Sequence, residues 1–132
     1  MALITRSSRA SFGPVSTLNA PQVAGLKAGE AIDLLAVCRI GSDGLVYMTD
    51  ATAANANAEV DGFAPRAYAV GEAVTLIGKG AQAKYADSGL TPGQRLYAAA
   101  TAGRLDNAAT VGDAQGVAKA ISATDIRIIR DA

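Results

Sequence analysis

The sequence predicts an all-β protein: a small antiparallel β-barrel or β-sandwich that is built from hairpins and carries an extended N-terminal arm. At four positions a glycine stands beside an acid or an amide and opens a short apolar run: Gly29, Gly71, Gly93 and Gly112. Glycine gives a tight turn its backbone freedom, and the polar neighbour keeps that turn in water. The runs are rich in Val, Ile, Leu or Tyr, which favour strands, and no stretch has a convincing helical period.

The 132 residues divide into an extended N-terminal arm, residues 1–28, and one β domain, residues 29–132. The arm contains no acid, and its two prolines, Pro14 and Pro21, hold the preceding residues in extended geometry. Its apolar side chains are too numerous for a segment that stays in water. We therefore expect the arm to dock on another surface, with a disordered tail as the alternative.

The first expected element of the domain is a hairpin. Residues 31–40 and 45–49 surround Asp43 and Gly44, a pair that is typical of hairpin turns because both positions tolerate positive φ. Residues 50–59 form a polar stretch rich in alanine and asparagine. Because alanine content alone does not stabilise a short helix, this stretch predicts a loop or one weak helical turn.

Shorter runs follow this loop. Residues 60–67 contain Pro65, which predicts a bent or edge strand at best. Residues 72–77 and 81–85 flank a glycine-rich turn and predict a second hairpin. The remaining expected strands are residues 94–100 with a short return at 104–105, then residues 115–121 and residues 125–130.

The chain lacks the side chains on which most catalytic and metal sites depend. It has no histidine and one cysteine, which excludes the commonest general base, the usual zinc sites and Ser-His or Cys-His nucleophiles. Cys38 lies in an apolar run, where we expect a buried thiol. Glu30, Glu72 and Asp113 stand in turn motifs. We predict no enzyme, no catalytic residue, no cofactor and no metal; a pair of carboxylates is the one enzymatic alternative.

Charge and hydropathy exclude two classes of partner. Twelve basic and twelve acidic residues give a formal net charge of zero, so we expect no nucleic-acid partner. The eight arginines are scattered along the chain, and most are expected to be ordinary solvated charges. No stretch approaches the ~20 apolar residues of a membrane span, and the first residues lack the layout of a signal peptide. We expect no membrane partner and synthesis in the cytoplasm.

Four stretches, taken in order, resemble the small capsid decoration (cement) proteins of tailed bacteriophages. They are AGEAIDLLAVCRIGSDGLVYMTDA, VDGFAPRAYAVGEAVTLIGKGAQAKY, SGLTPGQRLYAAATAGRL and VGDAQGVAKAISATDIRII. The features that carry the resemblance are a glycine and an acid before an apolar run, and the pattern Leu-Thr-Pro-Gly-x-x-Leu-Tyr. Residues 1–28 and 50–59 contribute little to it.

The resemblance implies a structural role in a virion. Proteins of this family bind the outer surface of the expanded capsid, usually as trimers, and cement neighbouring major capsid proteins. It therefore implies a homotrimer that is made in the host cytoplasm and whose partner is the major capsid protein. The residues that we expect to contact the capsid or another subunit are Leu3, Ile4, Arg6, Arg9, Phe12, Val15, Leu18 and Ile129.

A carbohydrate- or cell-surface-binding module of a phage head fibre is the alternative function. Such a module requires exposed aromatic rings gathered on one surface, on which sugar rings stack. Packing in the core or against other subunits is the commoner use of tyrosines in or beside strands. The candidates for a stacking platform are Tyr47, Tyr68, Tyr85 and Tyr97.

Overall fold

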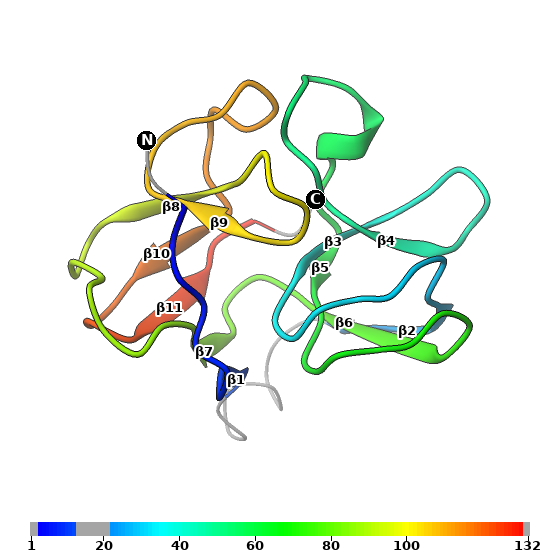
Figure 1. Cartoon of the computed structure of the whole chain (residues 1–132), viewed down its shortest axis with the longest axis horizontal. Helices are drawn as coiled ribbons and strands as arrows, with labels where there is room; N and C mark the ends of the chain where they lie inside the picture. The colour runs from blue at the N-terminus through cyan, green and yellow to red at the C-terminus, as the bar shows by residue number, and fades with distance from the viewer. Residues whose placement is uncertain (1–2, 13–21, 131–132) are drawn as a thin grey trace.

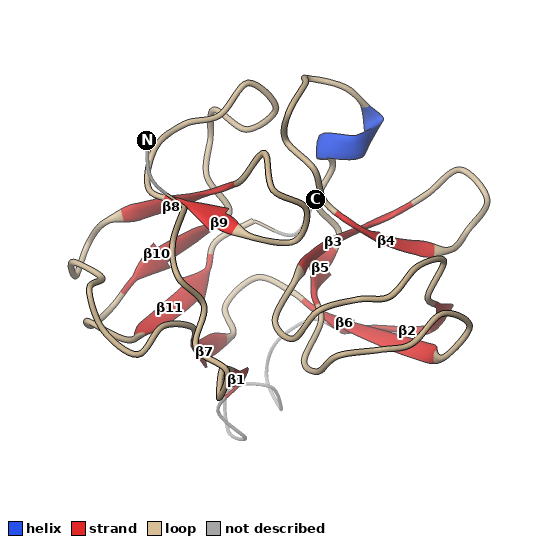
Figure 2. Ribbon diagram, in the orientation of Figure 1, coloured by secondary structure: helices blue, strands red, loops and turns tan. Residues whose placement is uncertain are grey.

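The computed structural model describes residues 3–12 and 22–130, which form two antiparallel sheets (Figures 1 and 2). One sheet has six strands, in the order β1 (Ser11–Phe12), β7 (Gln82–Lys84), β11 (Asp125–Ile128), β10 (Ala118–Ala120), β8 (Arg95–Ala98) and β9 (Leu105–Asp106). The other has five, in the order β2 (Gln22–Lys27), β6 (Ala73–Ile77), β5 (Gly62–Phe63), β3 (Val37–Ile40) and β4 (Val46–Met48).

The predicted all-β class is confirmed, and of its two forms the sandwich fits, because the sheets are not closed into a barrel. The expected loop at residues 50–59 contains a single 3₁₀ turn, η1 (Ala56–Ala58). The side chain of Asn55 caps this turn by accepting a hydrogen bond from the backbone N–H of Asn57. Short strands and long turns therefore make up the described part of the chain.

Two expected hairpins are confirmed by their registers. Cys38 of β3 lies opposite Met48 of β4, with the Asp43-Gly44 turn between the two strands. Strands β8 and β9 also pair antiparallel, as expected. Strands β10 and β11, which were expected as two strands without a stated pairing, form a further antiparallel pair. In each case the turn lies between strands that are adjacent in sequence, so local turn chemistry is sufficient to set the pairing.

The hairpin that was predicted from residues 72–77 and 81–85 is wrong. Strand β6 belongs to the five-stranded sheet and β7 to the six-stranded sheet, and the glycine-rich link between them passes from one sheet to the other. Ile77 and Ala81, on either side of the link, are both buried in the shared core. The two strands separate because each covers the core from its own side.

Of the bent or edge strand that residues 60–67 predict, the edge placement is also wrong. Strand β5 lies inside the five-stranded sheet, paired with β3 on one side and with β6 on the other. It is only two residues long and ends before Pro65, so the proline removes no hydrogen bond from the ladder. Gly62 has φ +155°, and a Cβ there would lie 2.8 Å from Cβ of Leu76.

The main core lies between the two sheets. Val37, Phe63 and Ile77 stand side by side across β3, β5 and β6, and pack with Ile126 and Ile128 of the six-stranded sheet. A second buried cluster uses the opposite face of the five-stranded sheet. Its members include Ile32, Cys38, Val46, Tyr68, Val74 and Leu76.

The N-terminal residues 3–12 cross the six-stranded sheet from one edge to the other. Leu3 forms a bridge with Asp106 of β9, and the Ile4 N–H donates to the Leu105 carbonyl at 2.8 Å. The Ser7 N–H donates to the Tyr85 carbonyl at 2.7 Å, and β1 then pairs with β7. Apart from a turn at Ser8 and Arg9, the described parts of the expected arm are extended, and they bind the sheets of the chain itself.

Candidate functional site

The apolar residues proposed to contact a partner divide into two groups. Ile4 and Phe12 are half-buried and pack against the main core, so these two side chains support the fold of their own chain. Leu3 keeps 43% of its surface exposed beside β9. Ile129 is half-buried, and its N–H donates to the Val117 carbonyl at 3.0 Å.

The remaining proposed contacts are two arginines and two residues of the arm. Arg9 is exposed, whereas Arg6 is half-buried close to the phenol of Tyr85. Burial raises the pKa of Tyr85, and the charges of Arg104 and Arg6 act in the opposite direction. Val15 and Leu18 lie outside the described residues.

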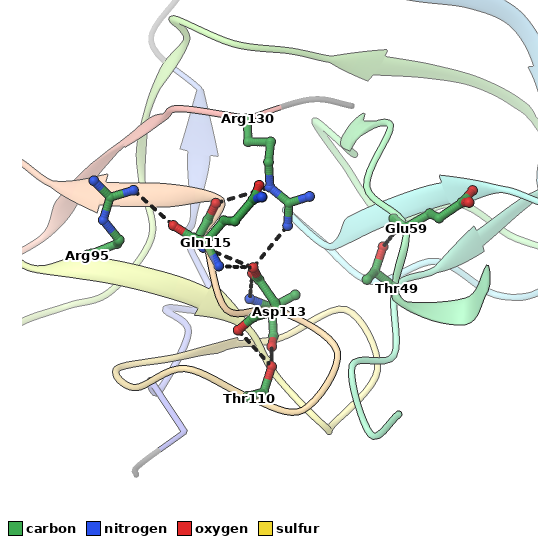
Figure 3. Close-up of polar contacts among 9 residues, drawn as sticks. Thr49, Glu59, Arg95, Thr110, Asp113, Gln115 and Arg130 are labelled. Atoms are coloured by element: carbon green, nitrogen blue, oxygen red, sulfur yellow. Dashed lines mark hydrogen bonds and ion pairs between the residues drawn. The ribbon is translucent and has the colours of Figure 1, made fainter. Parts of the chain in front are cut away.

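A buried carboxylate, that of Asp113, organises the loop between β9 and β10 (Figure 3). Its Oδ2 accepts a hydrogen bond from the Ala98 N–H at 2.8 Å, and its Oδ1 accepts from Gly116 N–H at 2.9 Å. Nη2 of Arg130 lies 3.0 Å from the same Oδ1. Arg130 also donates from Nε to the Gly116 carbonyl, so the guanidinium and the carboxylate hold the loop together.

A cleft of about 290 Å³ lies beside this network, lined by Glu59, Val60, Asp61 and Arg130. Oδ2 of Asp61 accepts a hydrogen bond from the Ile40 N–H at 2.8 Å, so this carboxylate binds the backbone at the end of β3. The guanidinium of Arg130 forms an ion pair with Asp113. Within residues 3–12 and 22–130, no group of three or more His, Cys, Asp or Glu side chains is arranged to hold a metal ion.

The acids of the turn motifs bind backbone amides, in keeping with their interpretation as turn residues. Oε2 of Glu30 accepts from the Met48 N–H at 2.8 Å. Oε1 of Glu72 accepts from the Ala69 N–H. Asp113 does the same and additionally pairs with Arg130. Glu72 therefore binds the backbone of its own turn, whereas Glu30 reaches β4 and Asp113 reaches β8.

The four tyrosines that are candidates for a sugar-stacking platform are distributed over both sheets. Tyr85 is completely buried in the main core, so it contributes nothing to a surface platform. Arg39 stacks over the ring of Tyr47 at 5.0 Å, and Arg66 stacks over that of Tyr68 at 4.2 Å. The aromatic faces that a sugar would need are thus in part covered by guanidinium groups of the same chain.

Sequence reasoning missed one cluster, a row of cations on the six-stranded sheet. Lys119 of β10 lies opposite Arg95 of β8 on one side and opposite Arg127 of β11 on the other. The alternation within each strand indicates that these side chains face outwards. Which of them become neighbours depends on the register, and the sequence carries no signal for pairing β8 with β10.

Comparison with protein-family models, with curated proteins and with solved structures finds no significant match. The resemblance to capsid decoration proteins therefore stays a prediction. Among the described residues, no helix has the length and apolar character needed to span a bilayer.

Proposed function

We propose that the chain is a structural virion protein that binds the outer surface of a phage capsid. There, as a homotrimer, it cements neighbouring major capsid proteins and stabilises the expanded head. The proposal draws on the resemblance of four sequence stretches, and on the way in which the chain presents one exposed apolar side chain.

The observation from which we place the contact surface is Val111, which is 74% exposed in the loop between β9 and β10. Its two neighbours are both fixed. Oγ1 of Thr110 donates to the Ala98 carbonyl at 2.8 Å, and the Gly112 N–H donates to the Ala51 carbonyl at 2.9 Å. Asp113 follows immediately and is pinned by Arg130. Val111 is therefore held in a fixed position at the surface, and we choose it as the apolar contact to test.

Rigidity matters because a fixed contact loses little conformational entropy when it binds. The loop is tied to β8 by Thr110 and Asp113, and through Ala51 to the loop that follows β4. Val111 therefore keeps one position relative to both sheets. Such a loop suits a protein that must hold a shell under tension.

The experiment uses expanded heads purified from the phage that encodes the chain. Purified full-length protein is mixed with the heads, and the bound copies are counted after sedimentation. We expect saturable binding, and we expect Val111→Asp to weaken it at least about tenfold, which is about 1.4 kcal/mol. The matched control is Val70→Asp, since Val70 is 67% exposed but lies in the turn before β6.

Two outcomes would overturn these proposals. If the wild-type chain does not bind expanded heads, the cementing role is wrong. If Val111→Asp binds as well as Val70→Asp, the loop is not the contact surface. Light scattering after size exclusion tests the oligomer, because a trimer has three times the 13.3 kDa chain mass.

A further inference from the structure

We propose that the outer face of the six-stranded sheet binds an acidic segment of a partner protein through Arg95, Lys119 and Arg127. These three residues, called here the cationic row, lie in register across β8, β10 and β11. All three are exposed. This surface goes beyond the cementing role, because its chemistry does not depend on which partner supplies the acid.

The residues beside the cationic row show that it faces outwards. Leu96, Ala118, Ala120, Ile126 and Ile128 flank the three cations along their strands and are all buried in the main core. Because side chains alternate along a strand, the cations stand on the opposite face of the sheet. Adjacent strands lie about 4.8 Å apart, so the row is about 10 Å long.

No carboxylate of the described residues neutralises the row. The next residue across the sheet is Gln82, which lies opposite Arg127 on β7. The guanidinium of Arg95 donates to a carbonyl, that of Gln115, at 2.9 Å (Figure 3). Asp125 faces outwards one row further along β11, where it lies opposite Lys84. Among residues 3–12 and 22–130, no ion pair joins the row to a carboxylate.

Like charges directly opposite one another destabilise a sheet. Lys119 has a cation opposite it in each neighbouring strand, Arg95 in β8 and Arg127 in β11. Most residue types are tolerated at an exposed strand position, so packing does not require a cation there. A partner that brings carboxylates to the row would remove this repulsion, so binding would be coupled to a gain in the stability of the sheet.

A short acidic protein segment fits the row better than the backbone of a nucleic acid. Strong phosphate binding uses an extended basic surface, often six or more contacts. The cationic row ends at the neutral Gln82 on one side, and Asp125 stands close by on the same face. A long polyanion would meet that carboxylate, whereas a segment with two or three acids would not.

The test measures binding of the full-length chain to a labelled short polyglutamate peptide and, separately, to an oligothymidylate of equal charge, by fluorescence anisotropy at low salt. The test variant is Lys119→Gln with Arg127→Gln. The control, Arg9→Gln with Lys27→Gln, removes the same charge from exposed residues outside the row. We expect the test variant to bind polyglutamate at least about tenfold more weakly and the control to bind within about twofold of wild type.

Each other outcome overturns the proposal. No binding by the wild-type chain, or equal losses in both variants, would show that the row is not a specific site. Tighter binding of oligothymidylate would assign the face to phosphates instead. Thermal unfolding of Lys119→Gln is an independent measurement: the variant should melt at a higher temperature than wild type at low salt, and this gain should vanish at high salt. A lower melting temperature at low salt would contradict the repulsion. Binding to phage heads is measured separately, so failure here leaves the cementing role standing.

Discussion

Arg130 places its Nη2 atom 3.0 Å from Oδ1 of Asp113, a carboxylate with no exposed surface. Asp113 lies in the loop between β9 and β10, and Arg130 stands two residues after the end of β11. The pair therefore fastens the C-terminal end of the described chain to the loop that presents Val111. Four donors converge on the carboxylate: the N–H groups of Ala98, Gln115 and Gly116, and the guanidinium.

Asp113→Asn should destabilise the protein strongly. The substitution removes a buried charge partner from Arg130 and replaces an acceptor oxygen with a donor group, at a site whose neighbours are all donors. Breaking a buried ion pair costs about 3–5 kcal/mol, and we expect a loss of about 3 kcal/mol in the free energy of unfolding. Urea unfolding monitored by circular dichroism measures it. Asp43→Asn, at an exposed turn, is the control and should cost less; equal losses would contradict the role of Asp113.

Gly62→Ala tests the close packing at the centre of the five-stranded sheet. The new Cβ would lie 2.8 Å from Cβ of Leu76 and 3.1 Å from the Ile77 carbonyl oxygen, at φ +155°. Backbone strain and overpacking add, so we expect a loss of about 3 kcal/mol in stability. Gly89→Ala is the matched control, because its φ is +95° with open space around the site. A Gly62→Ala protein as stable as Gly89→Ala would refute the packing argument.

Asp43, in the turn of the first hairpin, should titrate at a lower pH than an ordinary aspartate. The Tyr47 hydroxyl donates to Oδ2 of Asp43 at 2.6 Å, and this bond, with the Leu45 N–H, lowers the pKa of Asp43. Because the pKa of Asp43 is lower in the folded state than its unfolded value of about 3.9, the ionised carboxylate stabilises the fold at pH values above about 3.9. That contribution is lost as the pH falls through the folded-state pKa.

Tyr47→Phe should therefore raise the pKa of Asp43 towards its usual value, as measured by NMR titration of the side-chain carboxyl groups. Asp50 provides an internal control, because its low pKa comes from the hydroxyl and N–H of Thr52. The pKa of Asp50 should not move. An unchanged Asp43 titration would show that the Tyr47 hydroxyl does not donate to it in solution.

Cys38 should be chemically inert in the folded protein. The thiol is completely buried within the second cluster, and burial raises its pKa far above the usual value, with the charge of Glu30 adding to the effect. We expect no reaction with an aromatic disulfide reagent at about pH 8, where free thiols react readily. Addition of denaturant should restore full reactivity at the rate of unfolding. Rapid labelling without denaturant would contradict the burial.

Local chemistry was sufficient to predict part of the fold. The Asp43-Gly44 turn identified the β3–β4 hairpin, and a short turn identified the β8–β9 pair. In these cases the residues that set the backbone geometry lie within the turn itself. The lone cysteine in an apolar run also predicted a buried thiol correctly, because the residues around it form strands that are covered on that face.

The sequence by itself determined the all-β class, most strand positions and the turn role of Glu72. Only the tertiary structure decided which distant strands pair. It separated β6 from β7, placed β5 inside its sheet and laid residues 3–12 across the other sheet. It also brought Arg95, Lys119 and Arg127 into one row. The physical reason is that these contacts depend on how two sheets share one core. Turn preferences act over a few residues, whereas the burial of a shared core couples residues that lie far apart in the sequence.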